Sequence, residues 1–184
     1  MNILLHICCG PCLIYPLSRL KNQGFKISGF YYNPNLYPES EYYRRVAGLK
    51  VLAQEFSLQV EYPKHQAADF YQAIDNSGPI SQRCLSCWSL RLRKTALEAK
   101  QNGFKAFSTT LLVSPYQNHS LLKQLGDQIS QELGIDFHYE DFRPGFRQAQ
   151  LEAQRLGIYR QKYCGCQYSQ SPKARAAVGL AEAG

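Results

Sequence analysis

Apolar segments with strand character alternate along the chain with segments of helical spacing. Residues 2–7 form an apolar, β-prone run that ends at a turn rich in Cys, Gly and Pro. Further strands are predicted at 25–32, 58–62, 104–109 and 135–139, and helices at 12–23, 39–55, 66–75, 84–102, 119–133, 144–157 and 173–183. This alternation predicts an α/β fold: a Rossmann-like (HUP- or PP-loop-like) parallel sheet of about five strands flanked by helices.

The size and composition of the chain fit one folded domain. Its 184 residues are 45% hydrophobic and 19% charged, which is typical of a globular protein with a sizeable core. We expect a single domain over residues 1–184, with the recognisable motifs in 3–168 and a C-terminal tail at 169–184. Residues 1–7 lack the features of a signal peptide and no apolar run reaches membrane-spanning length, so we expect a cytoplasmic protein without a membrane partner.

The charge balance favours an acidic partner. The formal net charge is +7, and the chain contains 13 tyrosines. Basic surfaces attract phosphates, and exposed aromatic rings stack on bases, so the composition modestly favours a nucleic-acid partner.

All seven cysteines fall into three short clusters that lie far apart in the sequence. The clusters are Cys8-Cys9-Gly10-Pro11-Cys12, Cys84-Leu85-Ser86-Cys87 and Cys164-Gly165-Cys166. Gathered thiolates bind a soft metal, hold an iron–sulfur cluster or exchange electrons with a disulfide. Because cytoplasmic thiols stay reduced, metal binding or catalysis is favoured over structural disulfides.

The spacing within each cluster suggests a different use. Cys84 and Cys87 are three residues apart on a predicted helix, so both sulfurs share one face. With two adjacent thiols at the end of the first strand, they make four ligands, the usual number for a [4Fe-4S] cluster or for zinc. Cys164 and Cys166 are closely spaced, which suits a strained, easily reduced disulfide.

Polar loops follow other predicted strands and therefore lie at the same edge of the sheet. They carry Tyr32, Asn33, Asn35, Thr110, Tyr116, Gln117, Asp141 and Arg143, and Arg160 precedes the last cysteine cluster. Asn and Tyr side chains suit recognition of an RNA base. Arg44, Arg45, Arg91 and Arg93 are candidates for phosphate contacts or for a solvated helix face, and His6 is expected in the core or behind the ligands.

Six ordered motifs between residues 3 and 168 resemble the cobalamin-independent epoxyqueuosine reductases of the QueH type. They are Leu5-His6-Ile7-Cys8-Cys9-Gly10-Pro11-Cys12, Tyr32-Asn33-Pro34-Asn35, Cys84-Leu85-Ser86-Cys87, Ser108-Thr109-Thr110-Leu111 with Ser114-Pro115-Tyr116-Gln117, Asp141-Phe142-Arg143, and Tyr159-Arg160-Gln161-Lys162-Tyr163-Cys164-Gly165-Cys166. The resemblance implies an iron–sulfur enzyme that reduces epoxyqueuosine at the wobble position of tRNA to queuosine. It also implies two partners, the tRNA anticodon stem-loop and an electron donor.

The resemblance further implies roles for particular residues. The [4Fe-4S] ligands are expected to be Cys8, Cys9, Cys84 and Cys87. Cys12 is a candidate ligand of a second mononuclear metal ion, expected to be iron. We expect catalytic roles for Cys164 and Cys166 as a redox-active disulfide pair, and for Cys12 and Asp141. The expected substrate-binding residues are Tyr32, Asn33, Asn35, Thr110, Tyr116, Gln117, Arg143 and Arg160.

Two alternatives remain open from the residues alone. A thiol–disulfide oxidoreductase would use Cys9 and Cys12, whose spacing is that of a thioredoxin-type dithiol. A non-catalytic nucleic-acid-binding module would use the cysteines to hold structural zinc. The first alternative predicts activity without metal, and the second predicts a colourless protein that tolerates oxygen.

Overall fold

A parallel sheet with the strand order β3-β2-β1-β4-β5 forms the centre of the protein. The computed structural model describes residues 1–74 and 78–170, so the helix expected at 173–183 lies outside the described residues. The strands are β1 (Asn2–His6), β2 (Lys26–Phe30), β3 (Val60–Glu61), β4 (Ala106–Thr109) and β5 (Asp136–Phe137). The predicted α/β class and its sheet of five parallel strands are therefore confirmed.

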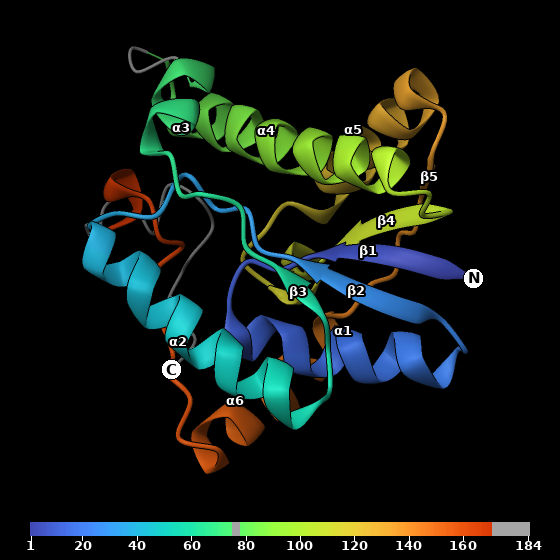
Figure 1. Ribbon diagram of the computed structural model, residues 1–184. Coiled ribbons are helices and arrows are strands. Elements are labelled where there is room, and N and C mark those ends of the chain that lie inside the picture. The colour runs from blue at the N-terminus through green and yellow to red at the C-terminus, as the bar shows by residue number, and fades with distance from the viewer. Residues whose placement is uncertain (75–77, 171–184) are drawn as a thin grey trace.

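Helices cover both faces of the sheet (Figure 1). They are α1 (Gly10–Asn22), α2 (Glu39–Glu55), α3 (Ala67–Ala73), α4 (Ile80–Gln101), α5 (His119–Leu133) and α6 (Phe146–Arg155), with short 3₁₀ turns η1 (Thr110–Val113), η2 (Arg143–Gly145) and η3 (Gln167–Ser169). Figure 1 shows α1, α2 and α6 on one face and α4 and α5 on the other, with α3 beside the start of α4. None of the helices in the described ranges is long and apolar enough to cross a membrane.

The central strand explains the core. β1 pairs with β2 on one side and with β4 on the other, and Ile3 and Leu5 are fully buried. A strand covered on both faces requires a continuous apolar run rather than alternation, which is what residues 3–5 supply.

The strand order creates the crevice that the site occupies. The chain runs from β1 to β2 on one side of the sheet and later crosses to β4 on the other side, so β1 and β4 mark a topological switch point. Loops at the carboxyl ends of strands diverge at such a point and leave room for a site. Cys8 follows β1, and Thr110 follows β4.

Several predicted boundaries differ from the observed ones. The predicted helix 12–23 begins earlier, at Gly10, with Pro11 in its first turn. The predicted helix 84–102 also begins earlier, at Ile80, because the extended Pro79 precedes it. Cys84 and Cys87 therefore lie inside α4 rather than at its start. The edge strands predicted at 58–62 and 135–139 shorten to Val60–Glu61 and Asp136–Phe137.

Candidate metal and redox site

The cysteine clusters come from three parts of the fold. The first lies in the turn between β1 and α1 and in the first turn of α1, the second lies inside α4, and the third lies in the coil after α6. Their seven members, all free thiols within the described residues, are Cys8, Cys9, Cys12, Cys84, Cys87, Cys164 and Cys166.

Cys8, Cys9 and Cys12 form a compact group, which we call the thiol triad. Their sulfur atoms all lie within 4.8 Å of one another, and the three side chains are at most 9% exposed. This spacing is roughly what a single ion with metal–sulfur bonds of about 2.3 Å requires. Cys9 is the N-cap of α1, whose dipole and free N–H groups favour negative charge at this end.

Two side chains from other elements support the thiol triad. Thr110 Oγ1 accepts a hydrogen bond from the Cys8 N–H at 3.0 Å and donates to Cys8 Sγ at 3.3 Å. Gln161 Nε2 donates to Cys9 Sγ at 2.8 Å. Hydrogen bonding from Cys12 and Cys9 lowers the pKa of Cys8 well below its usual value, so Cys8 carries negative charge most readily.

His6 is a neutral residue of the core behind the turn. Its Nε2 lies 3.1 Å from the Tyr32 carbonyl, and its Nδ1 lies 2.9 Å from the hydroxyl of Thr109, its register partner on β4. A carbonyl only accepts, so Nε2 carries the proton and Nδ1 accepts from the Thr109 hydroxyl. Burial, together with the charge of Arg91, lowers the pKa of His6 to about 4.

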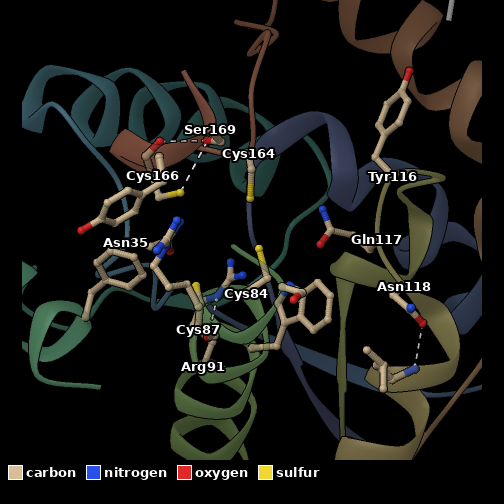
Figure 2. A pocket seen from close by; sticks show the side chains of 16 residues that line it. Asn35, Cys84, Cys87, Arg91, Tyr116, Gln117, Asn118, Cys164, Cys166 and Ser169 are labelled. Atoms are coloured by element: carbon tan, nitrogen blue, oxygen red, sulfur yellow. Dashed lines mark hydrogen bonds between the residues drawn. The ribbon is translucent and has the colours of Figure 1, made fainter. Parts of the chain in front are cut away.

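Four cysteines line a cavity of about 330 Å³ beside α4, which we call the thiol cavity. Cys84 and Cys87 approach it from α4, and Cys164 and Cys166 approach it from the coil after α6 (Figure 2). Burial, followed by the neighbouring sulfurs, raises the pKa of Cys84 and of Cys164 to about 12. In the absence of metal these thiols are therefore protonated near neutral pH.

Three polar residues line the same cavity. Tyr116 and Gln117 line it from the loop before α5, and Asn35 lines it from the loop after β2 (Figure 2). Asn35 is only 2% exposed, and both polar atoms of its amide lack hydrogen-bond partners within the described chain. Because buried polar groups are nearly always satisfied, this amide is suited to a ligand that both donates and accepts.

The coil that carries Cys164 is held by a buried ion pair on α2. Arg45 Nη1 donates to the Cys164 carbonyl at 3.1 Å, and Nη2 donates to the Tyr163 carbonyl at 3.2 Å. Arg45 Nε pairs with Glu41 at 2.7 Å, and the Tyr159 hydroxyl donates to the other Glu41 oxygen at 2.7 Å. Arg45 is thus fully engaged as a clamp on this backbone.

Gly165 allows the coil to dock tightly. Its φ is +123°, and a Cβ atom there would lie 2.4 Å from Leu36 Cδ2. The Gly165 carbonyl accepts from the Tyr37 N–H at 2.8 Å, and Ser169 Oγ donates to the Cys166 carbonyl at 2.8 Å. Only glycine combines this backbone angle with such a close approach.

Six of the eight expected substrate-binding residues fall into three sets. Asn35, Tyr116 and Gln117 line the thiol cavity. Thr110 instead supports Cys8. Tyr32 and Asn33 turn inward: the Tyr32 hydroxyl donates to Asp69 at 2.7 Å, and Asn33 Nδ2 donates to the Ile7 carbonyl at 2.8 Å.

Asp141, Arg143 and Arg160 do not line the thiol cavity. Asp141 pairs with Arg143, which lowers the pKa of Asp141 to about 2 and keeps the carboxylate ionised. Both side chains are partly exposed, and Arg160 is exposed in the segment after α6. These residues are available to a large ligand that extends beyond the cavity.

The interpretation of Arg45 and Arg91 as part of a solvated helix face is wrong, because both are buried, at 3% and 2% exposure. Glu41 precedes Arg45 by one helical turn on an inward face, a spacing that signals an ion pair. Arg91 follows Cys87 by the same spacing, so it shares the cysteine face of α4. Arg44 is exposed, and Arg93 forms a surface ion pair with Glu132.

The donor set fits a thiolate-bound metal centre. The thiol triad has single-ion spacing, and the cavity thiols provide further soft ligands close by. Buried Arg91 has an unpartnered Nη2 atom within the described residues, and its electrostatic neighbours are sulfurs of all three clusters. A buried cation in such surroundings fits an anionic thiolate–metal group.

Comparison with known proteins agrees with the motifs. The family model described as "Epoxyqueuosine reductase QueH" matches residues 3–172. Epoxyqueuosine reductase QueH of Thermotoga maritima is 37% identical over 176 residues, covering 91% of this chain and 90% of that protein. The protein of the same name from Dehalococcoides mccartyi is 32% identical over 170 residues, covering 92% of each chain. The chain therefore belongs to the QueH family of epoxyqueuosine reductases.

Proposed function

We propose that the protein reduces epoxyqueuosine at the wobble position of tRNA to queuosine, the last step of queuosine biosynthesis, with an iron–sulfur centre. The observation that carries this proposal is that sulfurs of all three cysteine clusters are electrostatic neighbours of buried Arg91, in a member of the QueH family. The net charge of +7 suits a tRNA partner. The reaction belongs in the cytoplasm, where thiols stay reduced.

In this proposal the cysteines divide between a cluster and a second metal. Cys8, Cys9, Cys84 and Cys87 hold the [4Fe-4S] cluster, and Cys12 is a ligand of a mononuclear iron at the thiol triad. Each thiolate of a cluster binds a different iron, so Cys8 Sγ and Cys9 Sγ, which lie 3.8 Å apart as free thiols, must move apart when the cluster binds. Bound iron supplies an electron relay and a Lewis acid for the departing oxygen.

Cys164 and Cys166 supply the electrons in this scheme. Removing the epoxide oxygen as water breaks two C–O bonds, forms one C=C bond and consumes two electrons and two protons. A dithiol that closes to a disulfide releases two electrons and two protons, so the reaction balances. An external electron donor must then reduce the disulfide before the next turnover.

The remaining residues bind and orient the tRNA. Asn35, Tyr116 and Gln117 face the cavity, so they contact the modified base. Arg143 and Arg160 contact phosphates outside it. Asp141 holds Arg143 in place and is too acidic to donate a proton near neutral pH. The other expected residues support the site from behind the surface. The Thr110 hydroxyl accepts a hydrogen bond from the Cys8 N–H, and Asn33 Oδ1 accepts one from Arg91. The Tyr32 carbonyl accepts one from the His6 ring.

The decisive experiment combines metal analysis with an assay on tRNA carrying epoxyqueuosine. We expect about four irons and four sulfides per cluster in anaerobically purified protein, any further iron belonging to the second site, and a product nucleoside lighter by one oxygen atom. Cys87→Ala should lose iron, sulfide and activity together. Cys164→Ala should keep the cluster but lose turnover.

Other outcomes favour the alternatives. Stoichiometric zinc without sulfide, and no reduction of the tRNA, would replace the proposal with a zinc-stabilised nucleic-acid-binding module. Thiol–disulfide exchange in metal-free protein that is lost in Cys9→Ser and retained in Cys84→Ser would replace it with a dithiol oxidoreductase. The nearly complete burial of Cys9 and Cys12 disfavours that enzyme.

A further inference from the structure

Arg91 is a buried cation without a carboxylate partner. Its Nε lies 3.3 Å from the Cys87 carbonyl and its Nη1 lies 3.4 Å from Asn33 Oδ1, both long for N–H···O bonds. Its Nη2 has no hydrogen-bond partner in the described part of the chain. Within residues 1–74 and 78–170, no ion pair joins Arg91 to an Asp or Glu side chain.

The other buried arginine shows what a satisfied guanidinium requires in this fold. Arg45 has almost the same exposure, yet it pairs with Glu41 and donates to two carbonyls. A buried charge with no counterion is strongly unfavourable, because the attraction of a partner must offset the loss of hydration. Arg91 therefore requires an anion that its protein neighbours do not supply as carboxylates.

The groups around Arg91 that can become negative are sulfurs. Its electrostatic neighbours are the thiols of Cys87, Cys164, Cys8 and Cys166, which represent all three cysteine clusters. Figure 2 shows Arg91 on the same side of α4 as Cys84 and Cys87, facing the thiol cavity. Cysteines bind metals as thiolates, so a centre with several such ligands is a net anion.

We propose that Arg91 is the counterion of the thiolate–metal centre, and that it both retains the centre and raises its reduction potential. The proposal rests on the proposed function for the existence of that centre. Adding an electron makes an anionic centre more negative, and a nearby positive charge favours the more negative state. Arg91 is thus a positioning and tuning residue that acts through the centre.

The first test compares stability with and without metal. In chelator-treated protein, Arg91→Met removes an uncompensated buried charge, so the variant should melt at the same or a higher temperature than the unchanged protein. In the iron-loaded state the order should reverse, because the variant loses the counterion of the centre. Arg93→Met is the matched control, since Arg93 lies two residues away and pairs at the surface with Glu132; its effect should be equal in the two states.

The second test measures the centre directly. In an anaerobic potentiometric titration with dithionite and mediators, Arg91→Met should lower the ratio of reduced to oxidised centre at a fixed potential at least tenfold, which equals 59 mV for a one-electron step. Arg91→Lys keeps the charge and should shift the ratio by less than Arg91→Met. Arg93→Met should leave it unchanged.

Each result decides between distinct conclusions. Two results would overturn the role of Arg91 while leaving the proposed function in place. One is an equal reduction potential in Arg91→Met and in the unchanged protein. The other is a metal-free Arg91→Met variant that is unfolded under conditions in which the unchanged metal-free protein is folded. If the unchanged metal-free protein is itself unfolded, the potentials decide. If the unchanged protein binds neither iron nor sulfide, the proposed cluster fails first and Arg91 loses its partner with it. If it binds zinc, comparing the melting temperatures of Arg91→Met and the unchanged protein with and without zinc still tests whether Arg91 is the counterion of the bound metal.

Discussion

The cysteine segments at residues 8–12 and 164–166 reach the same crevice by opposite means. The first is part of regular structure, because β1 runs directly into α1 and the turn between them is fixed at both ends. The second is irregular coil, held by Arg45, by the Tyr37 N–H and by Ser169. The backbone of the first segment is fixed by the strand and helix on either side of it, with Thr110 and Gln161 contacting its sulfurs. The second segment has no such flanking elements and is held by contacts from Arg45 and Tyr37, far away in sequence, and from nearby Ser169.

This difference bears on function. In the proposed function the thiol triad provides metal ligands, whose positions a strand–helix turn can fix. In the same proposal Cys164 and Cys166 form a redox pair that must open and close, and a coil tethered at a few points allows such motion. The comparison predicts that remote substitutions disturb Cys164 and Cys166 while leaving the thiol triad intact.

The largest effect is expected from Arg45→Met, which removes the tether and leaves Glu41 buried without its cation. Breaking a buried pair costs about 3–5 kcal/mol, and urea unfolding measures it. The adjacent Arg44→Met is the control, because Arg44 is exposed and its guanidinium lies over the Tyr159 ring, a contact worth about 0.5–1 kcal/mol. Equal costs in the two variants would show that the clamp has no special role.

Gly165→Ala should destabilise the protein by about 3 kcal/mol through its backbone angle and through the contact with Leu36. Gly24→Ala is the matched control, because the φ of Gly24 is also positive, at +81°, but a Cβ atom added there meets no atom within 4 Å. This variant should lower the free energy of unfolding by about 1 kcal/mol. Alkylation of Cys164 and Cys166, followed by mass spectrometry, should accelerate in the first variant only. Unchanged alkylation in Gly165→Ala would argue against a tightly docked coil.

Thr110→Val tests the other segment and should have the smallest effect. It leaves the buried Cys8 N–H without an acceptor, which costs about 1–2 kcal/mol, and should weaken metal uptake at the thiol triad. Thr95→Val is the control, because the buried Thr95 hydroxyl only donates to the Arg91 carbonyl within α4. Faster alkylation of Cys164 in Thr110→Val would contradict the conclusion that the two cysteine segments are positioned independently.

Features with local causes were predictable from the sequence. The helix predicted at 119–133 has the observed bounds, because the Asn118 side chain caps its start and Gly134, at φ +64°, ends it. The end of the first strand before Gly10 and Pro11 was likewise predictable, although α1 begins at Gly10, two residues earlier than predicted. In both cases neighbouring residues set most of the conformation.

Features that depend on distant partners were not predictable. The edge strands shortened because strand assignment requires a paired neighbour, and β3 and β5 each have one only over two residues. The burial of Arg45 and Arg91 depends on which helix face meets the sheet and the coil after α6. The inward turn of Tyr32 depends on Asp69, whose position the local sequence does not determine.

The order of the elements along the chain also governs when the centre can assemble during synthesis. β1 is completed by pairing with β4, and the thiol cavity gains two of its four cysteines from the coil after α6. At roughly 5–20 residues per second, the ribosome makes Cys8 on the order of ten seconds or more before Cys164. The thiols of the first cluster therefore lack the other two clusters during this interval, and in the proposed function the centre can be completed only after Cys166 has been made.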